Sequence, residues 1–545
     1  MLYCYIFLYI KIFLSLLIDC SKDWSSDVQP EKWNRIAKEK IDQMLNRNLN
    51  GKVAKNIILF LGDGMGMSTV TAGRIRKGQL KNNNGEEEIT FMESLPHVAL
   101  SKTYNINAQT ADSAGTATAY LTGVKTRIGA IGVDGRAFDC PTSLKSKTES
   151  ILKWAHYAGK STGIVTTTRI THASPAANYA NSFDRDMESF DGINFKQEHF
   201  DQGCKDIAAQ LIEENSYINL IFAGGRKKFL STNHTDYGST MKGDRIDGRN
   251  LIEEWQIKME RQMSKHKFLW NISDFHDLTT GQYDHILGLL NFDHMDYETD
   301  RVIKNPIEEP SIIDMTAKAI EILGSNPNGF FLMVEGGKID HGHHSSQAQL
   351  ALNDFVVFDE AVGQGVHLTS PNDTLIVVTA DHSHVFTIGG YSIRGNPILG
   401  ININRYSNVS LQNLTYTSLL YGNGPGGIKP DSLRRANLTN IQTEHKNYIQ
   451  ESAVYLKSET HGGEDVAIYS SGPMSFLFDG TVEQNYIAHV MAYSACIGPY
   501  NSTKYSKCDM NRGILVKSSA PDFLSSKINL FFLNIPLLLV IKNLN

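Results

Sequence analysis

Three apolar runs in this chain each end abruptly in carboxylate or imidazole side chains. They end at Leu61, Val334 and Ala380, and each has the length and composition of a buried strand. Functional groups just past the carboxyl ends of buried strands are typical of open α/β sheets. Chance seldom produces this arrangement three times in one chain. We therefore expect a mostly parallel sheet flanked by helices, with a shared metal cleft at one edge.

The stretch after the second run is the richest in metal-ligand side chains. It contains Glu335, Asp340, His341, His343 and His344, with glycines between them. Aspartate and histidine are ligands that Zn²⁺ accepts in proteins. The spacing of four residues would place Asp340 and His344 on one face of a helical turn, toward a single ion. A polar, histidine-rich surface loop is the alternative.

Further candidate ligands follow the other two runs. Asp63 lies among glycines after the first run, and Asp381, His382 and His384 follow the third. A turn aspartate is the alternative for Asp63. Near the end of the chain, His461 lies where the apolar pattern of the core resumes. We expect these side chains to converge on the same cleft.

Ser113 is the candidate nucleophile. It is followed by small residues suited to a tightly packed helix. A serine at a helix start lies beside free backbone N–H groups, which favour an anion such as phosphate. A helix N-cap is the alternative. The chain has no Gly-x-Ser-x-Gly motif around this serine, so the pattern does not support an acyl hydrolase.

A second strand-to-loop unit carries further polar candidates. After the strand-like run at 161–168 come His172 and Ser174, and Arg185 stands between two aspartates. The alternative for this arginine is a surface ion pair, the usual role of such a triplet.

Length and charge restrict the class of protein. At 545 residues the chain suits one large domain with insertions, or two domains. A net charge of −6 offers no basic footprint for nucleic acid. Residues 24–49 have apolar side chains at helical spacing and predict an amphipathic arm that packs on another surface. Residues 401–457 are rich in Asn, Gly and Thr, which suggests an inserted surface subdomain.

Both ends of the chain have the pattern of processing signals. Residues 1–19 are mostly apolar, are interrupted by Lys11 and end at Asp19. They predict a secretory signal cleaved near Cys20, with an amino-terminal membrane anchor as the alternative. Residues 528–541 form an apolar tail behind the small residues 518–520 and a spacer. That order predicts a glycolipid-anchor signal, because a spanning helix needs about 20 apolar residues.

Cysteines and sequons agree with an exported glycoprotein. Outside the signal the cysteines are even in number: Cys140, Cys204, Cys496 and Cys508. Asn-x-Ser/Thr sequons begin at Asn233, Asn271, Asn372, Asn408, Asn413, Asn437 and Asn501.

Taken in order, these motifs resemble those of the metazoan alkaline phosphatases, the tissue-nonspecific and placental-like enzymes with glycolipid anchors. The resemblance runs from about residue 24 to residue 515. It rests on the segments 60–66, 110–116, 171–175, 335–344, 379–384 and 460–461. Each segment alone is only moderately specific, whereas the ordered set is very specific.

The resemblance implies two zinc ions and one magnesium ion per subunit. The first zinc would be held by Asp340, His344 and His461. The second zinc would be held by Asp63, Asp381 and His382, and would contact Ser113. The magnesium ligands would be Asp63, Ser174 and Glu335, with His172 close by.

The same resemblance implies the reaction and the assembly. Phosphate monoesters would be hydrolysed through a phosphoserine at Ser113, with Arg185 gripping the phosphate. The implied disulfides are Cys140–Cys204 and Cys496–Cys508. The enzyme would be a homodimer at the cell surface, held by a glycolipid anchor, with the amino-terminal arm embracing the partner.

The implied boundaries are a signal peptide (1–20), an arm (21–50), a catalytic domain (51–392 and 458–515), a crown (393–457) and a removed anchor signal (519–545). Two alternatives remain: a related sulfatase or phosphodiesterase, and an inactive surface binding protein.

The chain departs from the family at a calcium site. Glu309 matches one of its acidic ligands and Asp236 is the candidate for a second, but the third position holds Asn291. Asp293 or Asp296 could shift in. We therefore expect weak or absent calcium binding.

Overall fold

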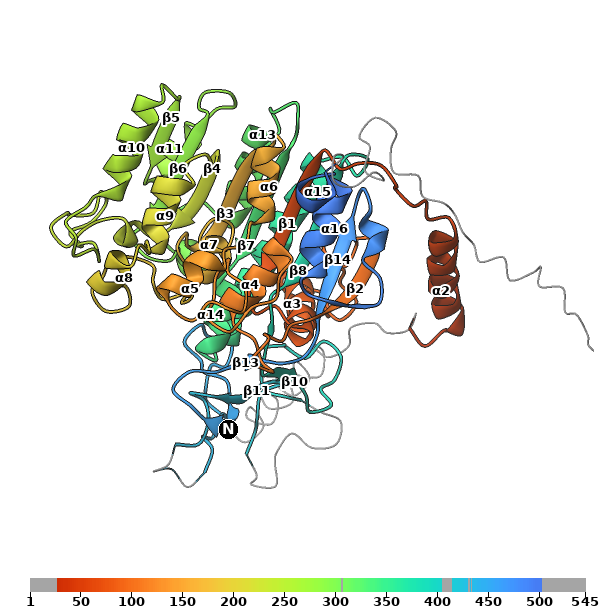
Figure 1. Ribbon diagram of the computed structural model, residues 1–545. Coiled ribbons are helices and arrows are strands. Elements are labelled where there is room, and N and C mark those ends of the chain that lie inside the picture. Colours follow the sequence, from red (N-terminus) through yellow and green to blue (C-terminus); the bar gives the residue numbers. More distant parts are fainter. Residues whose placement is uncertain (1–26, 305–306, 404–413, 430–431, 433, 502–545) are drawn as a thin grey trace, which may run out of the picture.

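The computed structural model describes residues 27–304, 307–403, 414–429, 432 and 434–501. Its centre is a sheet of ten strands in the order β15-β2-β14-β8-β1-β7-β3-β4-β6-β5 (Figure 1). The strands are β1 (Asn56–Gly62), β2 (His97–Lys102), β3 (Ser161–Arg169), β4 (Leu220–Gly224), β5 (His266–Leu269), β6 (His285–Asn291), β7 (Phe330–Gly336), β8 (Thr374–Ala380), β14 (Val466–Ser471) and β15 (Thr481–Glu483). Only β14 pairs antiparallel with its neighbours, so the expected mostly parallel α/β sheet is confirmed.

The three apolar runs form the adjacent strands β8, β1 and β7. Gly62 at the end of β1 pairs with Gly336 on one side and with Ala380 on the other. The three strands therefore end level with one another, and their following residues emerge at one edge. The polar residues that follow the three strands therefore lie at one edge of the sheet, as the sequence predicts.

Both faces of the sheet are buried, which explains why its strands are continuously apolar. Ile57 and Leu59 of β1 belong to the core on one face, and Ile58 and Phe60 belong to the core on the other. The first core is completed by α4 (Ser113–Thr122), α6 (Ile151–Tyr157), α7 (Ala173–Ala176), α9 (Ile207–Glu214), α10 (Leu251–Arg261) and α16 (Tyr486–Ser494). The second is completed by α3 (Met67–Leu80), α11 (Ile272–His276), α13 (Ile312–Leu323), α14 (Lys338–His344) and α15 (Ala348–Leu368).

Two small sheets lie beyond the carboxyl edge of the large sheet (Figure 1). The first contains β10 (Phe386–Ile388), β11 (Leu419–Gly424) and β12 (Ser452–Tyr455). β11 and β12 lie in the segment predicted as the crown, whereas β10 precedes the predicted crown boundary at residue 393. The second pairs β9 (Ser383–His384) with β13 (His461–Gly462), which brings two separate histidine motifs together.

The predicted amphipathic arm forms α2 (Pro30–Leu45), which stands apart from the sheet in Figure 1. No residue of α2 is buried, and its apolar side chains Trp33, Ile41 and Leu45 are exposed. The expected packing surface is therefore absent from the described part of this chain. An ion pair between Asp27 and Arg394 anchors the base of the arm.

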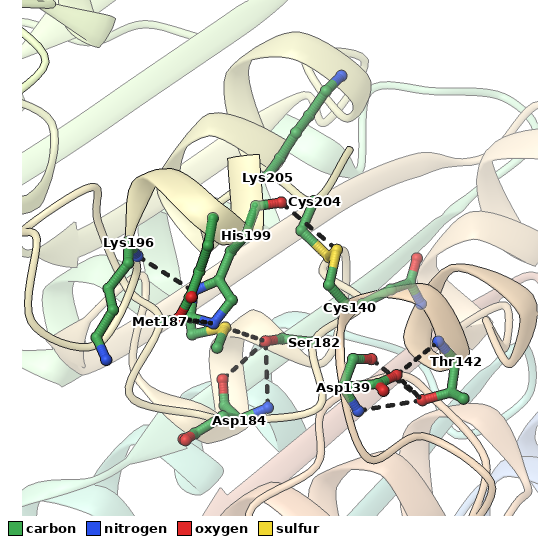
Figure 2. The surroundings of a disulfide bond; sticks show 12 residues. Asp139, Cys140, Thr142, Ser182, Asp184, Met187, Lys196, His199, Cys204 and Lys205 are labelled. Atoms are coloured by element: carbon green, nitrogen blue, oxygen red, sulfur yellow. Dashed lines mark hydrogen bonds and ion pairs between the residues drawn. A yellow bond between two sulfur atoms is a disulfide. The ribbon is translucent and has the colours of Figure 1, made fainter. Parts of the chain in front are cut away.

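The Cys140–Cys204 disulfide is present, with its Cα atoms 5.8 Å apart (Figure 2). It joins α5 (Cys140–Lys145) to the segment after α8 (Gln197–Asp201). Asp139 begins α5 through a capping box with Thr142, which fixes the direction of the first cysteine. The second predicted disulfide stays a prediction, because Cys508 lies outside the described residues.

None of the helices in the described ranges is long and apolar enough to cross a membrane. The predicted signal peptide and the predicted anchor signal both lie outside the described residues.

Candidate functional site

The first group of candidate ligands contains Asp340, His344, His384 and His461, whose ligand atoms all lie within 4.8 Å of one another. Asp340 and His344 both belong to α14, so the helical turn predicted from their spacing is confirmed. His461 arrives on β13, and its Nε2 lies 3.1 Å from Nε2 of His344 and 3.4 Å from Asp340 Oδ1. Three parts of the chain therefore supply one cluster.

Hydrogen bonds to backbone carbonyls orient two of these imidazoles. His344 Nδ1 lies 2.6 Å from the carbonyl of Glu459, and His461 Nδ1 lies 2.7 Å from the carbonyl of Ala111. A carbonyl accepts a hydrogen bond, so each Nδ1 carries the proton and each Nε2 presents a lone pair. This is the tautomer that a metal ligand needs.

The resemblance assigns His384 to no metal ion, and its hydrogen bonds give it a different role from that of the other candidates. Its Nε2 lies 2.7 Å from Asp340 Oδ1, and its Nδ1 lies 2.5 Å from Glu459 Oε2. Burial alone would lower the pKa of His384, but the hydrogen bonds to Asp340 and Glu459 raise it to about 10. A doubly protonated imidazole has no lone pair to offer, so this histidine holds Asp340 in place.

The second group brings Asp63, Asp381 and His382 together with Ser113, and all four residues are buried. His382 Nε2 lies 3.0 Å from Asp381 and 3.6 Å from Asp63. Ser113 Oγ lies 3.2 Å from His382 Nε2 and 3.5 Å from Asp63 Oδ1. Gly64 turns the chain after β1 in a left-handed conformation, with φ +69°, which favours glycine. A Cβ there would also lie 2.4 Å from Nε2 of His384.

The third group contains Asp63, His172 and Glu335. One oxygen of Glu335 accepts hydrogen bonds from Thr166 and Thr168 of β3. Burial raises the pKa of Glu335 to about 7. Asp63 belongs to both this group and the second, so one carboxylate links the two clusters.

Unpartnered buried atoms test whether these groups fit metal ions. At these groups, four oxygens and one ring nitrogen have no hydrogen-bond partner within the described chain: Asp63 Oδ2, Ser174 Oγ, Glu335 Oε1, Asp381 Oδ2 and His172 Nδ1. Burial, followed by the charge of Asp381, raises the pKa of Asp63. Leaving buried acceptors unpaired is costly, and a cation relieves that cost. The imidazoles and carboxylates of the first two groups suit zinc, and the oxygens of Asp63, Ser174 and Glu335 suit magnesium.

Ser113 is the first residue of α4, but it is not the N-cap. The N-cap is Asp112, whose Oδ1 accepts a hydrogen bond from the backbone of Gly115. The hydroxyl of Ser113 therefore stays available at the helix terminus. The alternative reading of this serine as an N-cap is wrong.

Arg185 is drawn toward Ser113 by the same capping aspartate. Its Nη1 donates to Asp112 Oδ2 at 3.2 Å, and its Nη2 lies 3.2 Å from His172 Nε2. A partner 73 residues away thus replaces the neighbouring aspartates that the sequence suggested. Oδ1 of Asp112 caps the helix while Oδ2 holds the guanidinium, which fixes both groups relative to each other.

Two further imidazoles lie beside His172. The ring of His341 lies 5.6 Å and that of His294 lies 5.3 Å from it, and the two are 4.4 Å apart. His294 was missed by the sequence analysis, and it follows β6 just as the predicted ligands follow their own strands. Arg169 contacts one of these imidazoles, with its Nη1 2.5 Å from His294 Nε2.

The residues that the resemblance matched to a calcium site take part in hydrogen bonds and ion pairs. Asn291 donates to one oxygen of Glu309, whose pKa is raised to about 7 by burial and by Asp296. Lys304 forms an ion pair with Asp296 at 2.5 Å. Asp236 is held separately by Arg226 in a buried ion pair. None of the three ligand groups in the described chain includes these residues.

We therefore expect metal analysis of the dialysed protein to find no stoichiometric calcium. Added calcium should change the melting temperature by less than about 2 °C, since a weakly bound ligand stabilises little. The matched variant is Asn291→Glu, which adds a carboxylate and should strengthen calcium binding. Calcium retained through dialysis by the unmodified chain would show that Asp293 or Asp296 rebuilds the site.

Comparison with known proteins decides the family. The sequence model described as alkaline phosphatase matches residues 54–497. The chain belongs to the alkaline phosphatase family. It is 50% identical over 476 residues to the tissue-nonspecific alkaline phosphatase of Homo sapiens, covering 86% of this chain and 89% of that protein. It is 48% identical over 477 residues to an alkaline phosphatase of Gadus morhua, covering 86% and 98%.

Solved alkaline phosphatases share the fold. The enzyme from the Antarctic bacterium TAB5 matches with a TM-score of 0.56 at 21% identity, over 82% of this chain and 99% of that one. The enzyme from Thermus thermophilus matches with a TM-score of 0.58 at 18% identity, over 83% and 93%. The resemblance stated from the motifs is therefore confirmed, and this alkaline phosphatase family member is a phosphomonoester hydrolase.

Proposed function

We propose that the enzyme hydrolyses phosphate monoesters through a phosphoserine at Ser113, at a site holding two zinc ions and one magnesium ion. The observation that carries this proposal is the position of Ser113 Oγ at the start of α4, 3.2 Å from His382 and 3.5 Å from Asp63. Around it lie buried carboxylate oxygens without partners.

Each metal has its own residues in this proposal. The first zinc is held by Asp340, His344 and His461. The second zinc is held by Asp63, Asp381 and His382, beside Ser113. Magnesium is held by Asp63, Ser174 and Glu335, with His172 nearby. When bound, the ions lower the pKa of hydroxyl and water and stabilise the charge on phosphoryl oxygens.

The chain's own groups bind and orient the ester. Arg185 donates two parallel N–H bonds to two phosphoryl oxygens, since its guanidinium is planar and always charged. The free backbone N–H groups at the start of α4 face the same anion. Asp112 keeps the guanidinium and the helix start in one arrangement. The phosphate is thereby held with its phosphorus next to Ser113 Oγ.

The reaction then runs in two displacements. Ser113 Oγ bonds to phosphorus while the ester oxygen leaves in line, which gives the free alcohol and the phosphoserine. Water attacks phosphorus in the second step and releases inorganic phosphate, which restores the serine hydroxyl. His384 takes part only indirectly, by holding Asp340.

Two other functions have less support. A sulfatase would place its nucleophile in a Cys-x-Pro-x-Arg-like context, which is absent around Ser113. An inactive binding protein would be expected to lack Ser113 or a ligand, yet all the predicted site residues are present.

The proposal predicts selective hydrolysis of a chromogenic phosphate monoester. The corresponding sulfate ester and phosphate diester should react at least about 100-fold more slowly, because the site is built for a dianionic phosphoryl group. A strong chelator should abolish turnover, and added zinc with magnesium should restore it. Preferred hydrolysis of the sulfate ester or the diester, or full activity in chelator, would contradict the proposal.

We further propose a dimeric enzyme at the cell surface. Support comes from the exposed apolar side chains of α2, which suit packing against a second copy.

The proposed division is a signal at 1–20, an arm at 21–50, a catalytic domain at 51–392 and 458–515, a crown at 393–457 and an anchor signal at 519–545. Glycosylation is proposed at the sequons, among which Asn233, Asn372 and Asn437 are exposed.

The proposed glycolipid anchor predicts release by phosphatidylinositol-specific phospholipase. The treated membranes should lose most phosphatase activity to the supernatant, because the apolar tail has been replaced by the lipid. A variant ending before residue 519 is the control and should be found in the medium. Activity that stays with the membrane after treatment would indicate a retained carboxyl-terminal helix instead.

A further inference from the structure

A cavity of about 580 Å³ lies at the opposite edge of the large sheet from the candidate active site. Its lining includes Lys160 and Ser161 at the start of β3, and His285 at the start of β6. β3 has nine residues, so the two edges are about 30 Å apart. None of the candidate active-site residues lines this basal cavity.

Lys160 is the most deeply buried of the basic residues in the lining. Its side chain is buried, with the residue 7% exposed. Nζ donates to the carbonyls of Lys55 at 2.7 Å and Asn328 at 2.9 Å. An ammonium group has three donors, so one N–H remains for a ligand. Burial and the charge of Lys55 lower the pKa of Lys160 to about 8, as expected for an ammonium without a counter-charge.

Lys258 of α10 lines the same cavity. Its Nζ donates to the carbonyls of Ile212 at 2.9 Å and Glu213 at 2.7 Å, at the end of α9. Burial lowers the pKa of Lys258 as well. Within the described residues, neither Lys160 nor Lys258 forms an ion pair with a carboxylate, and each is capped by carbonyl groups alone.

Two imidazoles and a phenol complete the polar lining. The ring of His156 stacks on that of Tyr217, with centroids 4.0 Å apart. The hydroxyl of Tyr217 is buried and has no hydrogen-bond partner in the described chain. His285 Nδ1 lies 3.0 Å from the carbonyl of Ile218, which leaves Nε2 for another partner. Burial, followed by the charge of His285, lowers the pKa of His156.

The acids near the cavity are already neutralised. Glu214 is the one carboxylate in the lining, and it is exposed and paired with Lys205 at 2.8 Å and Lys147 at 3.9 Å. The cavity therefore combines two lysines and two histidines with a single carboxylate, which is already paired with two other lysines.

We propose that the basal cavity binds an oxyanion of the phosphate class, held by Lys160, Lys258, His156 and His285. The spare N–H of each ammonium donates to the oxygens of the anion, in charge-assisted hydrogen bonds. The volume of about 580 Å³ also admits a diphosphate. This binding site does not depend on the proposed chemistry at Ser113.

The test is the stoichiometry of inorganic phosphate binding to the full-length enzyme with its metals, measured by titration calorimetry and equilibrium dialysis. We expect one equivalent per subunit beyond the phosphate that competes with the ester substrate, and we expect sulfate to displace it. Lys258→Met should weaken that second equivalent about tenfold or more. The inhibition constant of phosphate in the ester assay should stay unchanged.

Lys81→Met is the matched control, because Lys81 forms an exposed ion pair with Glu88 and the charge change is the same. His285→Gln is the second variant, since Lys258 also caps α9 and its loss could loosen that helix. Lys258→Arg should retain binding. The proposal is overturned if the enzyme binds only the inhibitory phosphate, or if both variants bind two equivalents as tightly as the unmodified chain.

Discussion

Replacing Ser113 by alanine is expected to lower the turnover of phosphate monoesters at least about 10³-fold, the scale on which nucleophile deletions act. The hydroxyl lies 3.2 Å from His382 and is the one nucleophile proposed at the start of α4. The fold should persist, because Asp112 and not Ser113 caps the helix. Steady-state kinetics, bound zinc and the melting temperature together provide the measurement.

Ser311→Ala is the matched control for this variant. Ser311 is the N-cap of α13 and forms a capping box with Asp314. Its loss should cost about 1 kcal/mol of stability while leaving turnover unchanged. The opposite pattern is expected for Ser113→Ala. Near-normal turnover in Ser113→Ala, with no phosphoserine trapped at low pH in the unmodified enzyme, would refute covalent catalysis.

The second large effect is expected for His461→Ala. The variant should lose one of the two proposed zinc ions, because a site with three protein ligands would retain only Asp340 and His344. Turnover should fall at least about 100-fold, the upper end of the effect seen for groups that only orient metal ligands. Zinc per subunit, measured by atomic spectroscopy after dialysis, checks the first expectation directly.

His489→Ala is the control for the loss of an imidazole. His489 lies between the carbonyl of Gly123 and the hydroxyl of Tyr500, away from the three ligand groups. It should keep both zinc ions. If His461→Ala retains the zinc content of the unmodified enzyme, His461 is a structural residue and the first zinc site must be reassigned.

Local patterns of sequence carried much of the prediction. Continuous apolar runs indicated strands buried on both faces, and the carboxylates and imidazoles after them indicated the edge where a site forms. The spacing of Asp340 and His344 indicated one helical turn, which α14 provides. Small residues after Ser113 indicated the tightly packed α4. Each of these signals lies within about ten residues, a distance over which backbone geometry alone relates side chains.

Other features depend on contacts between distant parts of the chain. Arg185 stands between two aspartates in the sequence but pairs with Asp112 in the fold. His384 follows its strand as the predicted ligands do, yet its Nδ1 is hydrogen-bonded to Glu459, which is 75 residues away. His294 joins His172 and His341 only because β6 ends near them. No local pattern carries these partnerships.

The sequence by itself determined where strands and turns form and which side chains could bind a metal ion. Hydrophobic period and residue type give this information because they act over short distances along the chain. Only the tertiary structure decided which groups meet. The strand order β8-β1-β7-β3 sets that choice, since it places Gly62, Gly336 and Ala380 level and brings Ser113 beside Asp63. The basal cavity has the same origin, because packing of strands and helices far apart in the chain brings Lys160 and Lys258 into one lining.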